Sequence, residues 1–296
     1  MGNTKNLIKL IIGFIVFFFT SYVALLFLKY GIKLDLTSFG KKELALADGC
    51  ISFIMVLIFT MLYFDVIKDS WMKLRNNFKG RISQFILAIV IGYLIVNAMQ
   101  ILASYISAIL FFITGVEMES ASNQQTIEEL LKSAPLIMII SSCLFAPIEE
   151  ELLFRGALRK CIKNKKVFIA CSGLIFGLMH VTDSIVFIGE LLLLGVVIDK
   201  IQNLNNKSKN SKIMLSVISV VLIFICFGVF YYFNYGNLIK IILSLDAKEV
   251  IGSVTYVIMG ITLAVLYIFN DENILTNVGI HALNNIVAIM LSLFLR

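Results

Sequence analysis

Long apolar runs separated by short polar segments make up most of this chain. A helix that crosses the hydrocarbon core of a bilayer needs about 20 mainly apolar residues. The runs that reach or approach this length lie at 7–28, 47–67, 82–115, 134–158, 166–182, 184–201, 213–235, 250–270 and 274–295. The pattern therefore predicts an all-α fold, a polytopic transmembrane helical bundle of about eight or nine helices.

The same pattern predicts the domain organisation. No stretch has the composition of a separate soluble domain, so residues 1–296 are expected to form a single multi-pass membrane domain. The stretch 202–212 is rich in Asn, Lys and Ser, which is typical of a flexible connector. The run at 7–28 is long for the core of a signal peptide, so we expect it to remain as the first span.

Composition excludes a soluble protein and changes the meaning of the net charge. Apolar residues make up 59% of the chain and charged residues only 15%, whereas an average soluble protein has about 25% charged residues. The net charge of +6 is therefore not an indication of nucleic-acid binding. The five cysteines are scattered and form no CxxC pair, which predicts inert packing.

Charged loops predict the orientation. Three segments are rich in Lys and Arg: 68–81, 155–166 and 199–212. Segment 116–133 instead carries four glutamates and one lysine. Because Lys and Arg mark cytoplasmic loops, nine alternating spans would place the N-terminus inside and Arg296 outside. The acidic turn at 271–273 fits this rule less well.

Carboxylates and imidazoles occur inside three of the predicted spans. The chain has two histidines, His180 and His281, each in an apolar run, and a third run contains Glu149-Glu150-Glu151. A charged side chain at the centre of a membrane helix costs roughly 2.5–3.5 kcal/mol on insertion scales. Since Glu and His together can activate water, these segments predict a hydrolytic site within the membrane.

Helix geometry places these groups at similar depths. Glu150 and His281 would lie roughly 14 Å, and His180 roughly 21 Å, from the cytoplasmic ends of their helices. The three side chains can therefore share one layer, inside the bilayer and nearer the cytoplasm. Glu151 and Arg155 are four residues apart and can pair on one helix face, which leaves Glu150 free to face a cavity.

Three further features bear on the site. Pro147 lacks a backbone N–H and is expected to open the helix before the glutamates and to expose a carbonyl. Gly173 and Gly177 predict close packing of their helix against a neighbour. Glu190, roughly 15 Å from its helix end, is either a partner in the site or substrate groove, or a structural polar contact.

Each motif taken alone also has a structural explanation. The glutamate run can be a solvated helix end, and either His180 or His281 can be a hydrogen-bonded core residue. Asn284 and Asn285 can bond across helices without taking part in chemistry. These explanations account for the joint arrangement less well than for any single part.

Three spaced motifs occur in order on separate runs: Glu150-Glu151-x-x-x-Arg155, Phe176-x-x-x-His180 and His281-x-x-x-Asn285. This set resembles the CPBP family of CAAX proteases and bacteriocin-processing enzymes, also called Abi proteins. The resemblance covers a motif-bearing core at 134–182 and 250–296. Residues from about 200 to 248 would be an extra helical insertion relative to that family.

The resemblance implies an intramembrane glutamic-type protease that needs no metal or cofactor. Glu150 and His180 would position and deprotonate a water molecule, and His281 and Asn285 would stabilise the oxyanion. Three residues would support the site: Glu151, Arg155 and Phe176. The implied partners are the lipid bilayer and a membrane-associated or lipidated peptide or protein, with CAAX, bacteriocin and pheromone peptides all open. The implied location is the cell membrane, with the site nearer the cytoplasmic side.

Three other functions remain open on the residues. Glu150, His180 and His281 form an adequate zinc ligand set, although the chain has no HExxH motif. A scaffold, chaperone or bacteriocin-immunity protein can retain the same residues by descent. A proton-coupled transporter also uses intramembrane Glu and His, but the sequence shows no inverted repeat.

Overall fold

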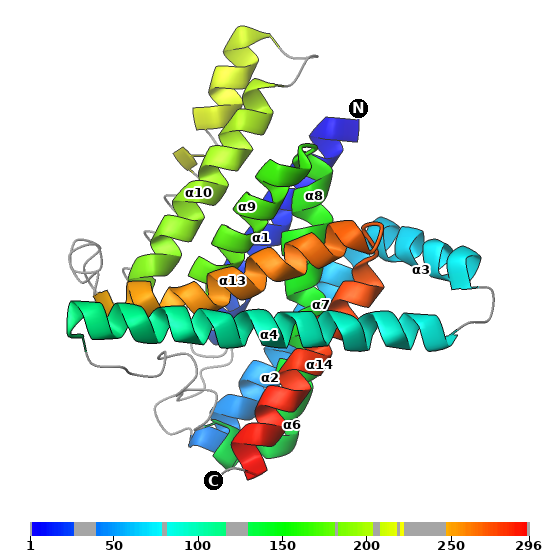
Figure 1. The fold of residues 1–296 in the computed structure, drawn as a ribbon. Coiled ribbons are helices and arrows are strands. Elements are labelled where there is room, and N and C mark those ends of the chain that lie inside the picture. Colours follow the sequence, from blue (N-terminus) through cyan, green and yellow to red (C-terminus); the bar gives the residue numbers. More distant parts are fainter. Residues whose placement is uncertain are drawn as a thin grey trace.

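The computed structural model is all-α over the residues that it describes, which confirms the predicted fold class for them (Figure 1). The described residues are 2–26, 40–78, 82–116, 130–180, 183–203, 208–217, 220–221 and 247–294. Within these ranges, four helices are long and apolar enough to cross a membrane: α2 (Lys41–Leu62), α4 (Ile82–Thr114), α13 (Ala247–Phe269) and α14 (Ile274–Phe294). A multi-pass membrane protein follows, and the total number of spans stays a prediction.

Three other predicted runs also form helices: α1 (Gly2–Leu26), α9 (Lys165–Leu178) and α10 (Asp183–Gln202). The predicted span 213–235 lies outside the described residues except at 213–217 and 220–221, and the predicted insertion at about 200–248 is described only in part. Arg296 also lies outside them.

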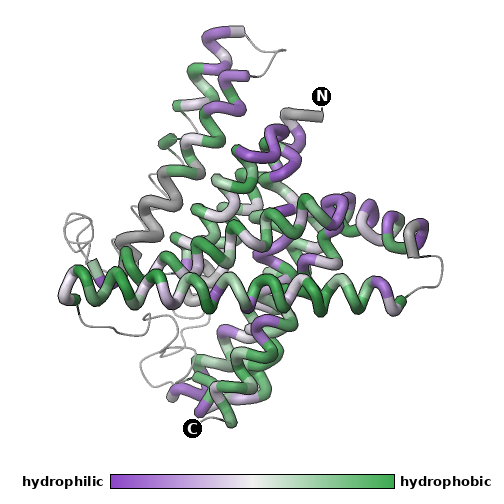
Figure 2. Tube along the Cα trace, viewed as in Figure 1, coloured by the Kyte–Doolittle hydropathy of each residue, from purple (hydrophilic) through white to green (hydrophobic). Residues whose placement is uncertain are grey.

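The second predicted run, 47–67, is wrong at its end. Helix α2 stops at Leu62, and a separate helix, α3 (Phe64–Phe78), begins after Tyr63. The reason is the charge that enters the sequence at Asp65, because charged side chains are costly in hydrocarbon. Figure 2 shows α3 as largely hydrophilic, in contrast to the apolar α4.

The predicted run 134–158 is a continuous but irregular helix. It consists of α6 (Pro135–Ile140), the π-helical turn η3 (Ser141–Phe145), α7 (Ala146–Glu150), the π-helical turn η4 (Glu151–Ala157) and α8 (Leu158–Cys161). The Ala146 N–H bonds the Ser141 carbonyl, five residues back. In that register the Ser142 carbonyl faces Pro147, which has no N–H to donate. The helix is therefore opened before the glutamates, as predicted, and π-helical turns often mark functional sites.

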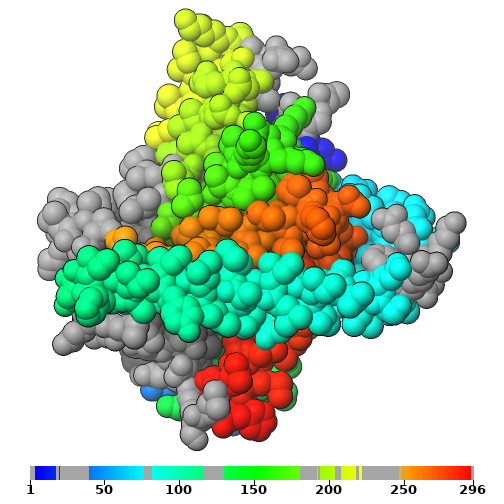
Figure 3. Space-filling view, viewed as in Figure 1, coloured from blue at the N-terminus to red at the C-terminus, as the bar shows by residue number. Residues whose placement is uncertain are grey.

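Helix α13 is packed between α9 and α4, and α4 crosses the front of the molecule alongside α13 (Figures 1 and 3). The α9–α13 contact depends on glycine. A Cβ atom added to Gly177 would lie 2.4 Å from Val257 Cα, and one added to Gly173 would lie 2.7 Å from the Ile261 backbone nitrogen. The predicted close packing of this helix is confirmed.

Charged residues from distant segments meet at one end of the bundle, which we call the charged end. It comprises Lys9, Asp65, Lys73, Arg159, Lys160, Asp271 and Glu272. Arg159 Nη2 lies 2.8 Å from Glu272 Oε1, and Lys73 Nζ donates to the Asp271 carbonyl at 2.7 Å. The acidic turn at 271–273 thus lies among basic side chains, and the predicted topology stays a prediction.

Candidate active site

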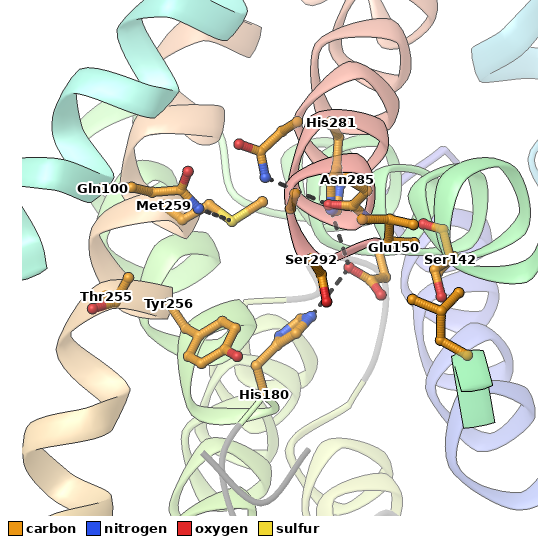
Figure 4. Close-up of a pocket in the computed structure, with 15 residues that line it drawn as sticks. Gln100, Ser142, Glu150, His180, Thr255, Tyr256, Met259, His281, Asn285 and Ser292 are labelled. Carbon is orange, nitrogen blue, oxygen red and sulfur yellow. Dashed lines mark hydrogen bonds and ion pairs between the residues drawn. The ribbon is translucent and has the colours of Figure 1, made fainter. Parts of the chain in front are cut away.

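Glu150 contacts both histidines of the chain (Figure 4). Glu150 Oε2 lies 3.4 Å from His180 Nε2 and 3.9 Å from His281 Nε2. The three side chains come from α7, from the turn that follows α9, and from α14. Their exposed fractions are 12%, 18% and 3%, so the cluster is largely shielded from solvent. The structure thus brings together the three residues that helix geometry predicted to lie in one layer.

A second, fully buried network lies behind this cluster. Glu151 Oε1 accepts hydrogen bonds from Arg155 Nη1 and His281 Nδ1, both at 2.9 Å. Glu151 Oε2 accepts from Asn277 Nδ2 at 2.6 Å, and Arg155 Nη2 donates to the Gly260 carbonyl at 3.0 Å. The predicted Glu151–Arg155 pair is confirmed, and the network holds the His281 ring in place.

Hydrogen bonds at the Nδ1 atoms fix the orientation of both imidazoles. The Nδ1 atom of His180 lies 2.7 Å from the Phe176 carbonyl, and a carbonyl can only accept, so this nitrogen carries the proton. The Nδ1 atom of His281 donates likewise to the Glu151 carboxylate. In the neutral rings, both Nε2 lone pairs therefore face Glu150. A proton or a polar ligand such as water between them relieves the repulsion.

The charges of the two networks also favour a proton between Glu150 and the histidines. The two networks contain two carboxylates, the fully buried Glu151 and the 12% exposed Glu150, and one guanidinium, that of Arg155. An uncompensated charge is strongly disfavoured in a buried site. One additional proton, shared between Glu150 and a histidine, neutralises the cluster, and such a proton is what acid–base catalysis requires.

Phe176 packs against most of the site. Its ring centroid lies 4.3 Å from that of His180 and 5.7 Å from that of His281. The Arg155 guanidinium carbon lies 4.3 Å from the same centroid. On the other side of His180, the ring of Tyr256 stacks at 5.4 Å with an interplanar angle of 18°. Phe176 and Tyr256 thus hold the His180 imidazole between them.

The end of α9 explains how His180 is placed. Asn164 caps the start of the helix, since its side chain accepts hydrogen bonds from two backbone N–H groups, and the helix ends at Leu178. It is therefore shorter than the predicted run 166–182. The His180 N–H turns to the Gly177 carbonyl at 3.2 Å, which leaves the Phe176 carbonyl without its helical donor. The imidazole of His180 takes that place.

The start of α14 sets the position of His281. Asn273 caps the helix, because its side-chain oxygen accepts from the Thr276 N–H at 3.2 Å. Its amide nitrogen donates to the Ser70 carbonyl at 3.1 Å, which ties α14 to α3. This fixed start places His281 about two turns inside the helix, level with Glu151.

Asn285 lies one turn beyond His281 on the same helix face. It donates from Nδ2 to the Ser142 carbonyl at 2.8 Å, the carbonyl that Pro147 leaves without a donor. Asn285 therefore bonds across helices, as its structural explanation predicts, and it also lines the cavity. The amide has a second N–H that this bond does not use.

A cavity of about 280 Å³ contains all four residues predicted to be catalytic: Glu150, His180, His281 and Asn285. Gln100, Thr255 and Ser292 add polar groups to its wall, and Leu131 and Ile289 add apolar ones (Figure 4). Sequence analysis missed Asn277, Tyr256 and Ser142. For Asn277 the signal was its spacing of four residues before His281.

The remaining predictions concern a metal and Glu190. In the described ranges, no group of three or more His, Cys, Asp or Glu side chains is arranged to hold a metal ion. The zinc hypothesis therefore gains no geometric support there. Glu190 falls within α10, but its side chain lies outside the described residues.

Comparisons with known proteins agree with the site. A sequence model described as "Type II CAAX prenyl endopeptidase Rce1-like" matches residues 132–287, more than half of the chain. "Putative membrane peptidase YdiL" of Bacillus subtilis (strain 168) is 32% identical over 133 residues, which are 44% of this chain and 52% of that protein. This chain thus spans about half the length of that curated relative. No solved structure matches the chain. From the family match, the chain belongs to the Rce1-like family of type II CAAX prenyl endopeptidases, the CPBP family that its motifs resemble.

Proposed function

We propose that this protein is a membrane-embedded endopeptidase that hydrolyses peptide bonds with a water molecule activated between Glu150 and the histidines. The observation that carries the proposal is the approach of Glu150 Oε2 to the Nε2 atoms of His180 and His281, at 3.4 and 3.9 Å. Both rings are held at Nδ1, so both Nε2 atoms are directed at the position where a water would react.

The hydrolytic step needs a base and then an acid. A water bound at Glu150 loses a proton to that carboxylate as its oxygen attacks the scissile carbonyl carbon. His180 Nε2 accepts a hydrogen bond from the second O–H of the water and orients it, and that hydrogen stays on the attacking oxygen. The C–N bond then breaks as Glu150 returns the proton to the leaving amine. General acid–base catalysis of this kind contributes typically about 10² to 10⁴-fold.

The negative charge that develops on the carbonyl oxygen needs donors. Asn285 supplies its unused N–H, and its bond to the Ser142 carbonyl fixes the direction of that group. His281 is held with its Nε2 atom toward the cavity, because its Nδ1 atom bonds the Glu151 carboxylate. One donor to an oxyanion is worth about 10² to 10³-fold in kcat.

The position of the site supports a substrate associated with the membrane. Glu150, His180 and His281 lie among helices that are apolar enough to reside in a bilayer. A membrane-associated or lipidated peptide can reach them from the bilayer. The charged end contains segments of the basic loops and supports a site nearer the cytoplasmic side.

The test compares Glu150→Gln with Glu149→Gln in cleavage of a quenched-fluorescent membrane-peptide library by purified protein. Glutamine keeps the shape of Glu150 but cannot take a proton, so kcat should fall by about 10³-fold or more. Glu149 is the matched control, since it is an adjacent buried glutamate that does not line the cavity. Its variant should retain cleavage.

Three outcomes would contradict the proposal. Full activity of the Glu150→Gln protein would remove its role as the base. Loss of activity with a chelator, together with about one bound zinc per chain, would favour a metal site. Absence of cleavage by folded wild-type protein would favour a scaffold or immunity protein.

A further inference from the structure

A second cavity, of about 520 Å³, lies beside the charged end and shares no lining residue with the candidate active site. It is formed by α1, by the end of α8 and the start of α9, and by the end of α10. Its polar lining consists of Lys160, Lys163, Lys200, Asp199, Asn164 and Asn203. The cavity therefore collects basic side chains from two separate basic segments of the sequence.

The charges of this lining favour an anion. Lys160 pairs with Asp65, and Lys200 pairs with Asp199 at 2.8 Å. Lys163 is exposed and forms no ion pair with any residue that the structure describes. Three lysines against one lining aspartate leave an excess of positive charge around the opening.

The apolar part of the lining favours an amphiphile over a free anion. Leu7 and Ile162 form a buried apolar floor, and Val167, 48% exposed, extends it along α9 toward the apolar body of the bundle. A free phosphate needs only the lysine rim. A lipid uses both parts, because its phosphate can bind the lysines while its acyl chains follow the apolar helices.

We propose that this cavity binds the phosphate headgroup of an anionic membrane lipid, with Lys163 and Lys200 as the principal contacts. Basic pockets between membrane helices on the cytoplasmic side bind such headgroups, and the positive-inside rule places this end of the bundle on that side. The proposal goes beyond the peptidase reaction and does not depend on it, because it concerns a separate cavity.

The experiment titrates the full chain, purified in neutral detergent, with phosphatidylglycerol or phosphatidylcholine and counts bound lipids by native mass spectrometry. Phosphatidylglycerol should bind at least about tenfold more tightly, since each lysine near a lipid phosphate contributes about fivefold in affinity. The double variant Lys163→Gln/Lys200→Gln should lose about 25-fold.

The matched control is Lys165→Gln/Lys166→Gln, which removes the same charge from the same end but from residues outside the lining. Its affinity for phosphatidylglycerol should stay within about twofold to threefold of wild type, because long-range attraction is screened. Asp199→Asn should bind phosphatidylglycerol more tightly, because it removes the negative charge that competes for Lys200. Unfolding of the variant cannot produce this gain in affinity for phosphatidylglycerol.

Two results would overturn the proposal. Equal losses in the two double variants would show diffuse attraction to a basic surface instead of a site. Displacement of phosphatidylglycerol by inorganic phosphate at millimolar concentration would show that a free phosphate, and not a lipid, is the ligand.

Discussion

Two regions of this molecule each hold a carboxylate between two basic groups, in very different surroundings. In the buried network, Glu151 bonds Arg155 and His281, and its side chain is 0% exposed. At the charged end, Asp65 bonds Lys9 and Lys160, and its side chain is 45% exposed. The number of basic partners is the same, although Glu151 also accepts a hydrogen bond from Asn277, so exposure to solvent is the main difference between the two regions.

This difference in exposure gives the two regions different roles. The buried network positions a side chain of the site, and the charged end holds polar segments together. A buried ion pair contributes little net stability, but loss of one partner strands a charge away from water. The buried network therefore permits only one arrangement of the His281 ring. At the charged end, water can replace a lost partner of the half-exposed Asp65, so its ion pairs tolerate change and mainly hold polar segments together.

The largest stability difference between the regions should come from removing one arginine from each. Arg155→Met leaves Glu151 and His281 without their buried guanidinium, and the free energy of unfolding should fall by about 3–5 kcal/mol. Arg159→Met at the charged end removes an ion pair with Glu272 and hydrogen bonds to the Ile162 and Lys163 carbonyls, so it should cost less, about 1–2 kcal/mol. Denaturant titration of both variants in detergent measures the contrast.

Similar losses for the two arginine variants would break the comparison. They would mean that water enters the network around Glu151 and screens it as it does the charged end. Cleavage by the Arg155→Met protein should also decline where it stays folded, because His281 loses its fixed orientation.

A smaller effect on stability is expected from Asn285, which lines the cavity of the candidate active site. Asn285→Ala removes the proposed oxyanion donor, so kcat should fall by about 10² to 10³-fold. KM should change little, because the donor acts on charge that develops in the transition state. The stability loss should stay near 1 kcal/mol, the contribution of the hydrogen bond to Ser142. A change confined to KM would instead indicate a substrate contact.

The contrast between the regions also shows what the sequence could predict. Run length and the spacing of four residues predicted the membrane helices and the Glu151–Arg155 pair, because both depend on local geometry. The spacing of four residues also places Asn277 on the face of His281, but it does not give the bond from Asn277 to Glu151 or the stacking of Tyr256 on His180. Their contacts join segments far apart in the sequence, which helix periodicity does not relate.

Local chemistry predicted some irregularities and missed others. Pro147 predicted the opened helix, because a missing backbone N–H affects hydrogen bonding within one helical turn. The early end of α9 was not predicted, since it depends on the His180 side chain bonding the Phe176 carbonyl. The end of α2 at Leu62 was not predicted, because apolar residues continue on both sides of Asp65. The sequence does not show that Asp65 forms an ion pair with the distant Lys9.

The smallest predicted effect is the contribution of Asp65, at the charged end, to the pH dependence of stability. Burial alone would raise the pKa of Asp65, but hydrogen bonds from Lys160 and Lys9 outweigh it and lower the pKa to about 2. Since this lies below the ordinary value of 3.8, the stabilisation is complete above about pH 4 and is lost as the pH falls toward 2. Asp65→Asn should remove that dependence and cost no more than about 1 kcal/mol at neutral pH, because the side chain is screened by water. Thermal unfolding of wild type and variant across this pH range measures both effects. A loss of several kcal/mol at neutral pH would mean that the charged end behaves like the buried network.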